Sequence, residues 1–530
     1  MLRPFAALVA AALLLPVPDA AAQGRSDQGR GDPATLRVKL FGDLRSIDPF
    51  ISPEYMARNH GYMVYDTLFA LDSKLQPRPQ MVARWTTSPD GLTWDFTLRE
   101  GLRFHDGAVV TAEDVVASLK RWAVRDGLGQ QLMALATALE PTAPDAFRIT
   151  LRAPFGLMLE ALAKPSGQPA FIMPARVAAT PATTPITDPT GSGPFTLRRE
   201  DWRAGDRVTY RRNPAYIPRA EPPDGLSGGK RAGIERVEWV YLPDAQTALN
   251  ALVAGEIDIF EELPPDLFPV VRRTRTLRLG GQDNVGVQPI FRMNQAVPPF
   301  DNPRLRQAML HLVDPAKVLP AYLPDATLWR DCRSFYVCGS PHHTSTGWVT
   351  PDLAEARRLV AASGYDGTPV VVLDAQDSTI SHSLAMVSAD LLQHAGIKVD
   401  IQAMDWATLV QRRLSRTPGP QGWNLFVSAP SGLDAMDPAG HNAMRSACER
   451  TGLPGWPCDA EMETLRDAFL AAPEADTRRT AAAAYHARAL ASVPYVPLGQ
   501  FSLVRGYSAR LQGILDAPVP VYWNIGKSND

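Results

Sequence analysis

Residues 88–107 read SPDGLTWDFTLREGLRFHDG, and TAEDV follows at residues 111–115. Residues 94–99 alternate apolar and polar side chains, as a half-buried strand does, and Gly101 and the Asp106-Gly107 pair supply turns. Thr111 precedes a helical run over residues 115–124, and acidic residues stand at the positive end of that run. The stretch therefore predicts a strand, a hairpin and a capped helix.

Outward from this stretch the chain alternates strands and helices, which is typical of an α/β fold. The predicted strands are 35–41, 234–241, 257–259, 370–373 and 398–403, and the predicted helices are 244–254, 303–313, 352–363 and 381–395. A chain of 530 residues is about three times the usual domain length, so we expect more than one core.

The first residues carry the pattern of a secretory signal peptide. Residues 1–22 combine Arg3, an apolar run over 5–17 and three alanines at 20–22. That run is shorter than the roughly 20 residues a membrane-spanning helix needs. Residues 23–34 are polar and predict a disordered leader. The first cysteine is Cys332, so we expect no lipid anchor, and the exported protein should be free in the periplasm.

Composition and motifs argue against several functions. The formal net charge is -2 and no basic cluster is present, which excludes the usual pattern of nucleic-acid binding. Phosphate-binding glycine loops and zinc-protease spacing are also missing. Residues 225–229, GLSGG, match a serine-hydrolase elbow, but their charged and proline-rich surroundings predict a solvated glycine loop. His342-His343 is interpreted as loop surface. We expect no catalytic residue, no metal and no cofactor.

The cysteines form two close pairs, Cys332/Cys338 and Cys448/Cys458. Four cysteines permit three pairings, and in an exported chain the sequential one closes two short loops. The Cys-x5-Cys and Cys-x9-Cys spacings fit a zinc site poorly. We therefore expect disulfides Cys332–Cys338 and Cys448–Cys458.

The quoted stretch resembles the signature of the family 5 extracellular solute-binding proteins, which are the dipeptide-, oligopeptide- and nickel-binding components of ABC importers. Further matching segments are SIDP at 46–49, GSGPFTL at 191–197, RRNPAY at 211–216, AGEID at 254–258 and FDNPRLRQA at 300–308. The resemblance covers essentially the whole mature chain.

The resemblance implies an α/β, two-lobed periplasmic binding protein fold of type II, in the large cluster with an extra subdomain and a hinge between the lobes. The implied domains are a lobe I base at 35–73, 190–287 and 497–530, an extra subdomain at 74–189, and lobe II at 288–496. The chain would cross between lobes near 282–290 and 493–498.

The resemblance also implies ligand-binding residues. In peptide-binding relatives the acidic residue of a W-x-x-D-Y-x-D-P segment pairs with the peptide's amino terminus. The corresponding stretch is SGLDAMDP at 431–438, which places Asp434 at the acidic position but lacks both aromatic residues. A loop-capping role for Asp434 is the alternative. Tyr55 and the loop residues Lys164, Ser166 and Gln168 are further ligand-binding candidates, and Trp423 is either a cleft wall or core.

The implied function is capture of a small peptide or similar polar solute and its delivery to an ABC permease with its ATPase. We expect a monomer with peripheral contact to the inner-membrane permease, and no nucleic-acid partner. Alternatives are a non-peptide ligand such as a metal chelate or an opine-like compound, a modified peptide such as glutathione, a periplasmic peptidase, or a chaperone or receptor on the same clamp.

Overall fold

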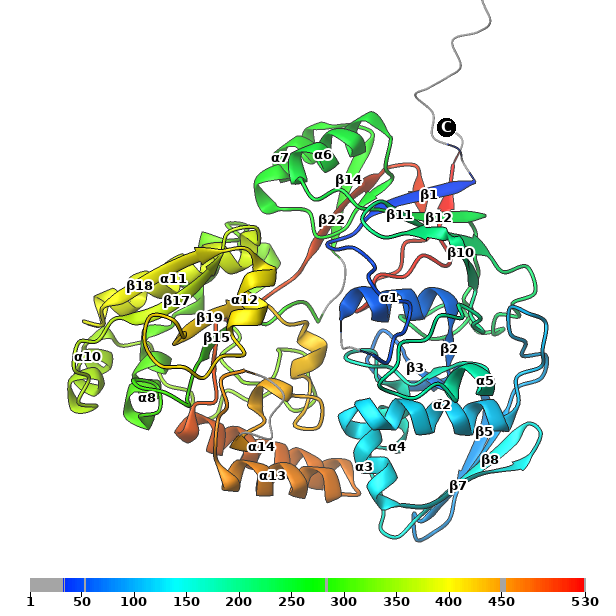
Figure 1. The fold of residues 1–530 in the computed structure, drawn as a ribbon, viewed down its shortest axis with the longest axis horizontal. Coiled ribbons are helices and arrows are strands. Elements are labelled where there is room, and N and C mark those ends of the chain that lie inside the picture. Colours follow the sequence, from blue (N-terminus) through cyan, green and yellow to red (C-terminus); the bar gives the residue numbers. More distant parts are fainter. Residues whose placement is uncertain (1–31, 33, 52–53, 282–284, 449–453, 529–530) are drawn as a thin grey trace, which may run out of the picture.

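The computed structural model describes residues 32, 34–51, 54–281, 285–448 and 454–528. The predicted signal peptide at 1–22, most of the predicted leader at 23–34 and part of the first predicted crossing lie outside these residues. Among the described residues, no helix has both the length and the apolar character that crossing a bilayer requires. The α/β, two-lobed fold expected from the sequence is confirmed, and Figure 1 shows the two lobes side by side.

Lobe I is built on a seven-stranded sheet in which β1 lies parallel to both of its neighbours. Its strands in spatial order are β10 Phe195–Arg203, β11 Arg207–Arg212, β12 Arg236–Val240, β1 Thr35–Lys39, β13 Ile259–Phe260, β22 Val504–Ser508 and β14 Leu277–Gly281. The helices beside it are α1 Tyr55–Val64, α6 Ala245–Ala254 and α7 Phe268–Arg273. Strand β22 comes from the far end of the chain and lies between β13 and β14.

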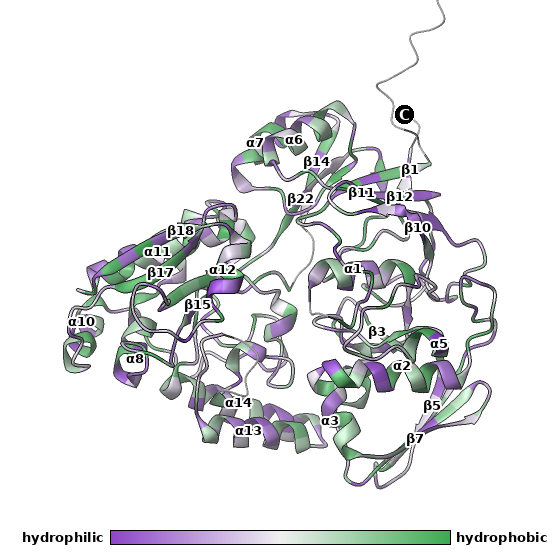
Figure 2. Cartoon of the chain, viewed as in Figure 1, coloured by the Kyte–Doolittle hydropathy of each residue, from purple (hydrophilic) through white to green (hydrophobic). Residues whose placement is uncertain are grey.

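Residues 88–115 contribute β6 and the start of α2 to the extra layer of lobe I. Its antiparallel sheet consists of β5 Val82–Thr87, β6 Thr93–Leu98, β8 Ala146–Leu151 and β7 Ala136–Ala143, next to helices α2 Ala112–Arg125 and α3 Gly127–Leu135. Asp114 accepts hydrogen bonds from the Thr111 backbone N–H at 2.8 Å and from the Ala175 N–H at 2.7 Å, so it stabilises the start of α2. Figure 2 shows α2 with alternating hydrophilic and hydrophobic segments, which matches one buried and one solvated face.

Lobe II contains a five-stranded mixed sheet. Its strands in spatial order are β18 Val399–Met404, β17 Val370–Ala375, β19 Leu425–Ser428, β15 Ile290–Met293 and β20 Val496–Pro497. Its helices are α8 Pro303–Leu312, α9 Pro315–Val318, α10 Leu353–Ala362, α11 Thr379–His394, α12 Trp406–Arg412, α13 Ala460–Ala471 and α14 Ala475–Ser492. The three strands β18, β17 and β19 are parallel, and β15 runs antiparallel to β19 and β20.

The shorter elements connect these layers. They are β2 Asp66–Thr67, β3 Phe69–Leu71, β4 Pro77–Pro79, β9 Phe171–Ile172, β16 Trp329–Arg330, β21 Gln500–Phe501, β23 Leu511–Gln512, β24 Gly526–Lys527, α4 Met158–Ala163 and α5 Ala175–Ala178. We propose the domain boundaries stated above as the division of the chain. The strand membership of the three large sheets supports them, although β20 spans the proposed boundary between 496 and 497.

Two segments connect the lobes and lie against each other. Val287 and Phe501 exchange backbone hydrogen bonds of 2.8 and 3.0 Å, and the Leu498 N–H donates to the Pro289 carbonyl at 2.8 Å. Gly499 lies in the returning segment with a φ of 103°, a conformation that favours glycine. The lobes therefore share a paired, glycine-containing connection of the kind that can act as a hinge.

The prediction of a solvated loop at 225–229 was wrong. Residues 225–230 are buried, and Lys230, which is 0% exposed, donates to Asp66 Oδ1 at 2.7 Å. The positive φ of Gly225 and Gly228 lets the backbone turn inward against its neighbours. The Ser227 hydroxyl donates to the Asp224 carbonyl at 2.9 Å, so its hydrogen bond is local.

Candidate functional site

A hydrogen-bonded bridge joins the lobes at Asp434. The Tyr55 hydroxyl donates to Asp434 Oδ2 at 2.5 Å, and the Ser166 hydroxyl donates to Asp434 Oδ1 at 2.6 Å. The Ser431 backbone N–H donates to the Tyr55 oxygen at 3.0 Å. Tyr55 and Ser166 belong to lobe I and Asp434 to lobe II. The structure therefore brings together three of the predicted ligand-binding residues in a closed arrangement of the lobes.

Tyr55 is positioned by the turn that precedes α1. Asp48, which is 0% exposed, accepts hydrogen bonds from the N–H groups of Phe50 and Ile186 at 2.9 and 3.1 Å. It also forms a buried ion pair with Arg121 at 2.6 Å. The SIDP segment thus has a structural role, because its carboxylate holds the chain entering the first turn of α1, where Tyr55 begins the helix.

Ser166 lies in the 164–168 loop, which Lys164 and Gln168 hold in place. Lys164 forms an ion pair with the buried Asp126, and the Gln168 side-chain amide donates to the Phe50 carbonyl at 2.6 Å. The Gln168 carbonyl accepts from Trp122 Nε1 at 2.6 Å. Lys164 and Gln168 therefore support the loop, while Ser166 is the predicted loop residue that reaches Asp434.

The Asp434 loop is tied to the inter-lobe connection. Residues Gly432–Ala435 form a 3-10 turn, and the Gly432 N–H donates to the Gly286 carbonyl at 2.7 Å. The Ala435 carbonyl accepts from the Val337 N–H at 3.1 Å. The acidic residue consequently sits on a short turn that contacts both the first crossing segment and the loop closed by the Cys332–Cys338 disulfide.

The electrostatics of the bridge are those of a carboxylate with neutral donors. Burial, followed by the negative charge of Asp434, raises the pKa of Tyr55 well above its usual value, so the hydroxyl keeps its proton and donates. Burial lowers the pKa of nearby His441 to about 4, so this imidazole is neutral at pH 7. Among the described residues, no lysine or arginine nitrogen lies within 4.0 Å of the Asp434 carboxylate. The Arg58 guanidinium lies over the Tyr55 ring, 4.3 Å from its centroid, and its positive charge partly offsets the effect of Asp434 on the pKa of Tyr55.

Trp423 lies elsewhere, in a core of lobe II. Its side chain is 1% exposed, its ring packs on Phe426 with centroids 5.1 Å apart, and its Nε1 donates to the Ser415 carbonyl at 2.9 Å. This environment favours the core interpretation over the cleft-wall interpretation.

A second contact between the lobes was missed in the sequence. Glu160 on α4 and Arg478 on α14 form an ion pair at 3.7 Å, and Gly156 approaches so closely that a Cβ there would lie 2.6 Å from the Ala472 carbonyl. The pair joins residues more than 300 positions apart, and no local pattern marks either of them. The α13–α14 hairpin therefore supports the closed arrangement at the far end of the interface.

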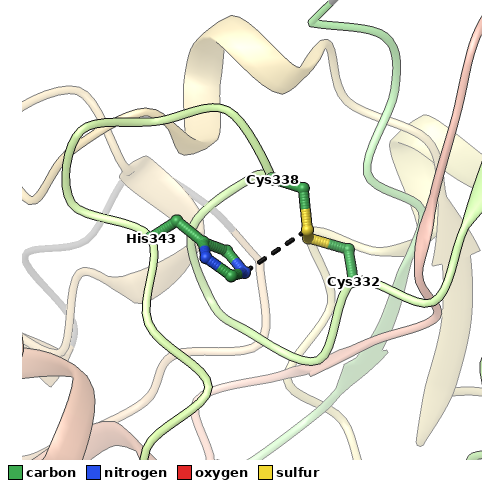
Figure 3. Close-up of side chains that lie close together, drawn as sticks. All are labelled: Cys332, Cys338 and His343. Carbon is green, nitrogen blue, oxygen red and sulfur yellow. Dashed lines mark hydrogen bonds between the residues drawn. A yellow bond between two sulfur atoms is a disulfide. The ribbon is translucent and has the colours of Figure 1, made fainter.

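Both expected disulfides, Cys332–Cys338 and Cys448–Cys458, are confirmed, and Figure 3 shows Cys332–Cys338. Their Cα atoms lie 5.8 and 4.2 Å apart, and no free cysteine is found in the described part of the chain.

The chain is similar to known solute-binding proteins. The profile described as "Bacterial extracellular solute-binding proteins, family 5 Middle" matches residues 76–445. The probable peptide ABC transporter periplasmic-binding protein y4tO of Sinorhizobium fredii is 35% identical over 501 residues, which cover 93% of each chain. The glutathione-binding protein GsiB of Salmonella typhi is 26% identical over 385 residues, or 69% of each chain.

Solved structures show the same fold. The binding protein AgaA of A. tumefaciens, in complex with agropinic acid, aligns with a TM-score of 0.76 at 22% identity over 94% of this chain and 99% of that one. DppA of Helicobacter pylori, in complex with the peptide STSA, aligns with a TM-score of 0.76 at 18% identity over 93% of this chain and 98% of that one.

Proposed function

Because the chain belongs to the family 5 bacterial extracellular solute-binding proteins of ABC importers, we propose that it captures a small peptide or a similar polar, amine-bearing solute between its lobes and delivers it to a membrane permease. Closure around the ligand would present the bound state to the permease, and the affinity would reflect contacts made only in that state.

The observation that carries the ligand proposal is the bridge at Asp434. A carboxylate offers about four acceptor positions, and the hydroxyls of Tyr55 and Ser166 use two of them. A protonated amine can bind the remaining positions with charge-assisted hydrogen bonds. Asp434 would then bind the ligand while Tyr55 and Ser166 hold the carboxylate in place.

A non-peptide solute is the second candidate. Ser431 and Ala435 stand where peptide-binding relatives carry aromatic residues, so the walls that flank a peptide's amino terminus are missing beside Asp434. The named ligands of similar proteins include glutathione for GsiB and agropinic acid for AgaA. An opine-like compound or a metal chelate with a hydrogen-bond donor fits the same carboxylate.

The remaining proposals concern location and partners. Family 5 binding proteins are extracellular or periplasmic and work with a permease. We propose that residues 1–22 direct export of this chain, that the mature protein is a free periplasmic monomer, and that it contacts the permease of an importer driven by a separate ATPase. The relatives are binding proteins, and we propose that this chain likewise binds its solute without converting it.

Native mass spectrometry of protein purified from the periplasm tests the proposal. We expect a co-purified small solute with a protonated amine, which calorimetry with the released compound confirms as a ligand at one site. Conversion of the compound on incubation would contradict a binding protein. A ligand without any cationic or hydrogen-bond donor group would contradict the role of Asp434 and leave the transport role standing.

A further inference from the structure

A buried ammonium group lies at one edge of the lobe I sheet. Lys39 ends β1, pairs in parallel register with Phe260 of β13, and is 9% exposed. Its Nζ lies over the Phe260 ring, 4.3 Å from the centroid. In the part of the chain that the structure describes, no oxygen accepts a hydrogen bond from this nitrogen. An ammonium has three donors, and burying it without an acceptor is costly.

Two other buried lysines show what such a group ordinarily requires. The side chains of Lys230 and Lys527 are each 0% exposed, and each forms an ion pair with an aspartate, at 2.7 and 2.8 Å. Among the described residues, no carboxylate oxygen lies within 4.0 Å of Lys39 Nζ. Burial lowers the pKa of Lys39, and the negative charge of Glu262 partly opposes that effect. Lys39 therefore differs from the lysines that stabilise the fold, and its charge is open to an external partner.

Glu262 is an acidic group beside Lys39 that can change its charge. Its φ of 52° is uncommon for a residue with a Cβ and is kept only where the surroundings hold it. No lysine or arginine nitrogen of the described residues lies within 4.0 Å of its carboxylate. Burial raises the pKa of Glu262 to about 7; Lys39 and Arg58 lower it in part, and Glu261 raises it further. Glu262 can therefore take up a proton at neutral pH and donate a hydrogen bond.

The Lys39–Glu262 pair lies where the two lobes meet. Both residues stand at the carboxyl ends of parallel strands β1 and β13, the edge at which open α/β sheets bind ligands. The charge of Glu262 acts on Tyr322 of lobe II and on Arg58 of α1. The Arg58 guanidinium lies over the ring of Tyr55, which donates to the carboxylate of the bridge. The pair is therefore part of the same inter-lobe surface as the bridge.

We propose that Lys39 and protonated Glu262 together bind a carboxylate of the solute whose amine binds Asp434. The inference rests on the proposed function, because it needs a solute held between the lobes. One carboxylate oxygen accepts from Lys39 Nζ, and the other accepts from the carboxyl proton of Glu262. That proton comes from the solvent and removes the repulsion between two carboxylates. The solute class narrows to small zwitterions, and binding takes up a proton.

Acetate is a suitable probe, because it is a carboxylate without an amine and its methyl group can be followed by saturation-transfer NMR. The full protein is titrated with sodium acetate at constant ionic strength. We expect saturable binding at pH 6 and an apparent affinity about tenfold weaker at pH 8, because the protonated fraction of Glu262 falls by that factor across its pKa of about 7. Acetate itself is ionised at both pH values. A lack of saturable transfer at pH 6 would overturn the proposal.

Two variants separate a specific site from a general attraction of anions. Lys39→Met should weaken acetate binding about tenfold or more, whereas Lys120→Met, which removes an exposed lysine of α2, should bind as the parent does. Glu262→Gln keeps a donor, so acetate should still bind, and the difference between pH 6 and pH 8 should vanish. Parent-like binding by Lys39→Met, or a retained pH dependence in Glu262→Gln, would overturn the site. If Lys39→Met does not fold, the pH profile of Glu262→Gln decides alone.

A second probe distinguishes this inference from the proposed function. Methylammonium is the cationic counterpart of acetate, and Asp434→Ala should lose its binding while keeping that of acetate. Acetate bound at Lys39 without methylammonium bound at Asp434 would support the carboxylate site and count against an amine-bearing solute. Methylammonium bound without acetate would overturn the carboxylate site and leave the proposed function intact.

Discussion

The Tyr55 hydroxyl and Asp434 Oδ2 lie 2.5 Å apart, although 379 positions separate the two residues in the chain and each belongs to a different lobe. Their hydrogen bond therefore joins the two lobes directly. The Ser431 N–H bonded to the same hydroxyl, and the Ser166 hydroxyl bonded to the other carboxylate oxygen, make the contact a small network rather than a single bond.

Replacing Asp434 by alanine should weaken ligand binding by roughly two to three orders of magnitude, because leaving a buried cation unpaired costs about 3–5 kcal/mol. Asp437→Ala is the matched control. Asp437 Oδ1 accepts the N–H groups of Ala439 and Gly440 at 2.8 and 2.9 Å, which stabilises the same loop without reaching lobe I. Calorimetry should show near-normal affinity for Asp437→Ala and a stability loss of about 0.5–2 kcal/mol. Equal affinities for both variants would show that Asp434 does not anchor the ligand.

Removing the two lobe I hydroxyls should favour the open state in the absence of ligand. Tyr55→Phe combined with Ser166→Ala takes away both hydrogen bonds to Asp434, each worth about 0.5–1.5 kcal/mol. We expect a larger radius of gyration by small-angle scattering than for the parent protein. Tyr365→Phe, which loses a hydroxyl bonded to the Thr368 carbonyl and the Lys398 N–H of its own lobe, should leave the radius unchanged. A double variant with the parent radius would mean that the bridge does not hold the lobes together.

Gly499→Ala should destabilise the connection between the lobes. The φ of 103° disfavours any residue with a Cβ, which would also lie 2.7 Å from Leu319 Cδ1 and 2.9 Å from Pro315 Cβ. We expect a lower melting temperature by an amount corresponding to about 1–3 kcal/mol. Gly281→Ala, at the end of β14 just before the other crossing, is the control, since a Cβ there meets no atom within 4 Å. The same melting temperature for both variants would contradict a strained hinge position.

Acid should destabilise the protein through buried histidines. Burial lowers the pKa of His60 to about 3 from the model-compound value of 6.5. Between these two pH values the imidazole is therefore protonated in the unfolded chain and neutral in the folded chain. The stability from this residue is complete above pH 6.5 and is lost as the pH falls toward 3, by up to about 1.4 kcal/mol per pH unit.

The His60→Gln variant should therefore show a flatter fall of melting temperature between pH 6.5 and 4.5 than the parent protein. The exposed His394 provides the control, and His394→Gln should keep the parent slope. His441 and His486, whose pKa values burial lowers to about 4, should retain part of the acid sensitivity in His60→Gln. If the melting temperature of His60→Gln falls as steeply with pH as that of the parent protein, His60 titrates normally in the folded state.

The disulfides should contribute to stability without deciding the fold. Their sequence separations of 6 and 10 correspond to about 2–3 kcal/mol each in the loop-entropy description. Peptide mapping without reduction should recover Cys332 linked to Cys338 and Cys448 linked to Cys458. Denaturant melts of Cys448→Ser/Cys458→Ser should retain one cooperative transition at a lower midpoint. Alkylation of all four cysteines in periplasmic protein would contradict the pairing.

Local features were predictable from the sequence because their partners are near in the chain. Thr111 and Asp114 form the capping box at the start of α2. Gly255, Gly364 and Gly396 each follow a helix and have a positive φ. The predicted helices at 303–313 and 352–363 appear as α8 Pro303–Leu312 and α10 Leu353–Ala362. Each of these depends on contacts within one or two turns, which residue type and periodicity encode.

Contacts between distant segments were not predictable in this way. Asp434 was identified only through the family resemblance, and no pattern linked it to Ser166. The roles of Lys164 and Gln168 depend on Asp126 and Phe50, and the burial of Lys230 depends on Asp66, 164 positions away. A charged residue in a polar stretch looks solvated until its partner is known, which is why the loop at 225–229 was misread.

The position of β22 has a consequence for how the chain matures. In the described part of the chain, β14 pairs with β22 alone and β22 pairs with β13, so the edge of the lobe I sheet stays incomplete until residues 504–508 are available. The five-stranded sheet of lobe II draws all its strands from 290–497, although the short strand β16 of the same lobe pairs with β21 at 500–501. If the chain is exported from its amino end, as we propose, the lobe II sheet can therefore assemble before the lobe I sheet is complete. A fragment ending after Pro497 should hold a complete lobe II sheet beside an incomplete lobe I sheet, which would make such a fragment a ready substrate for proteases.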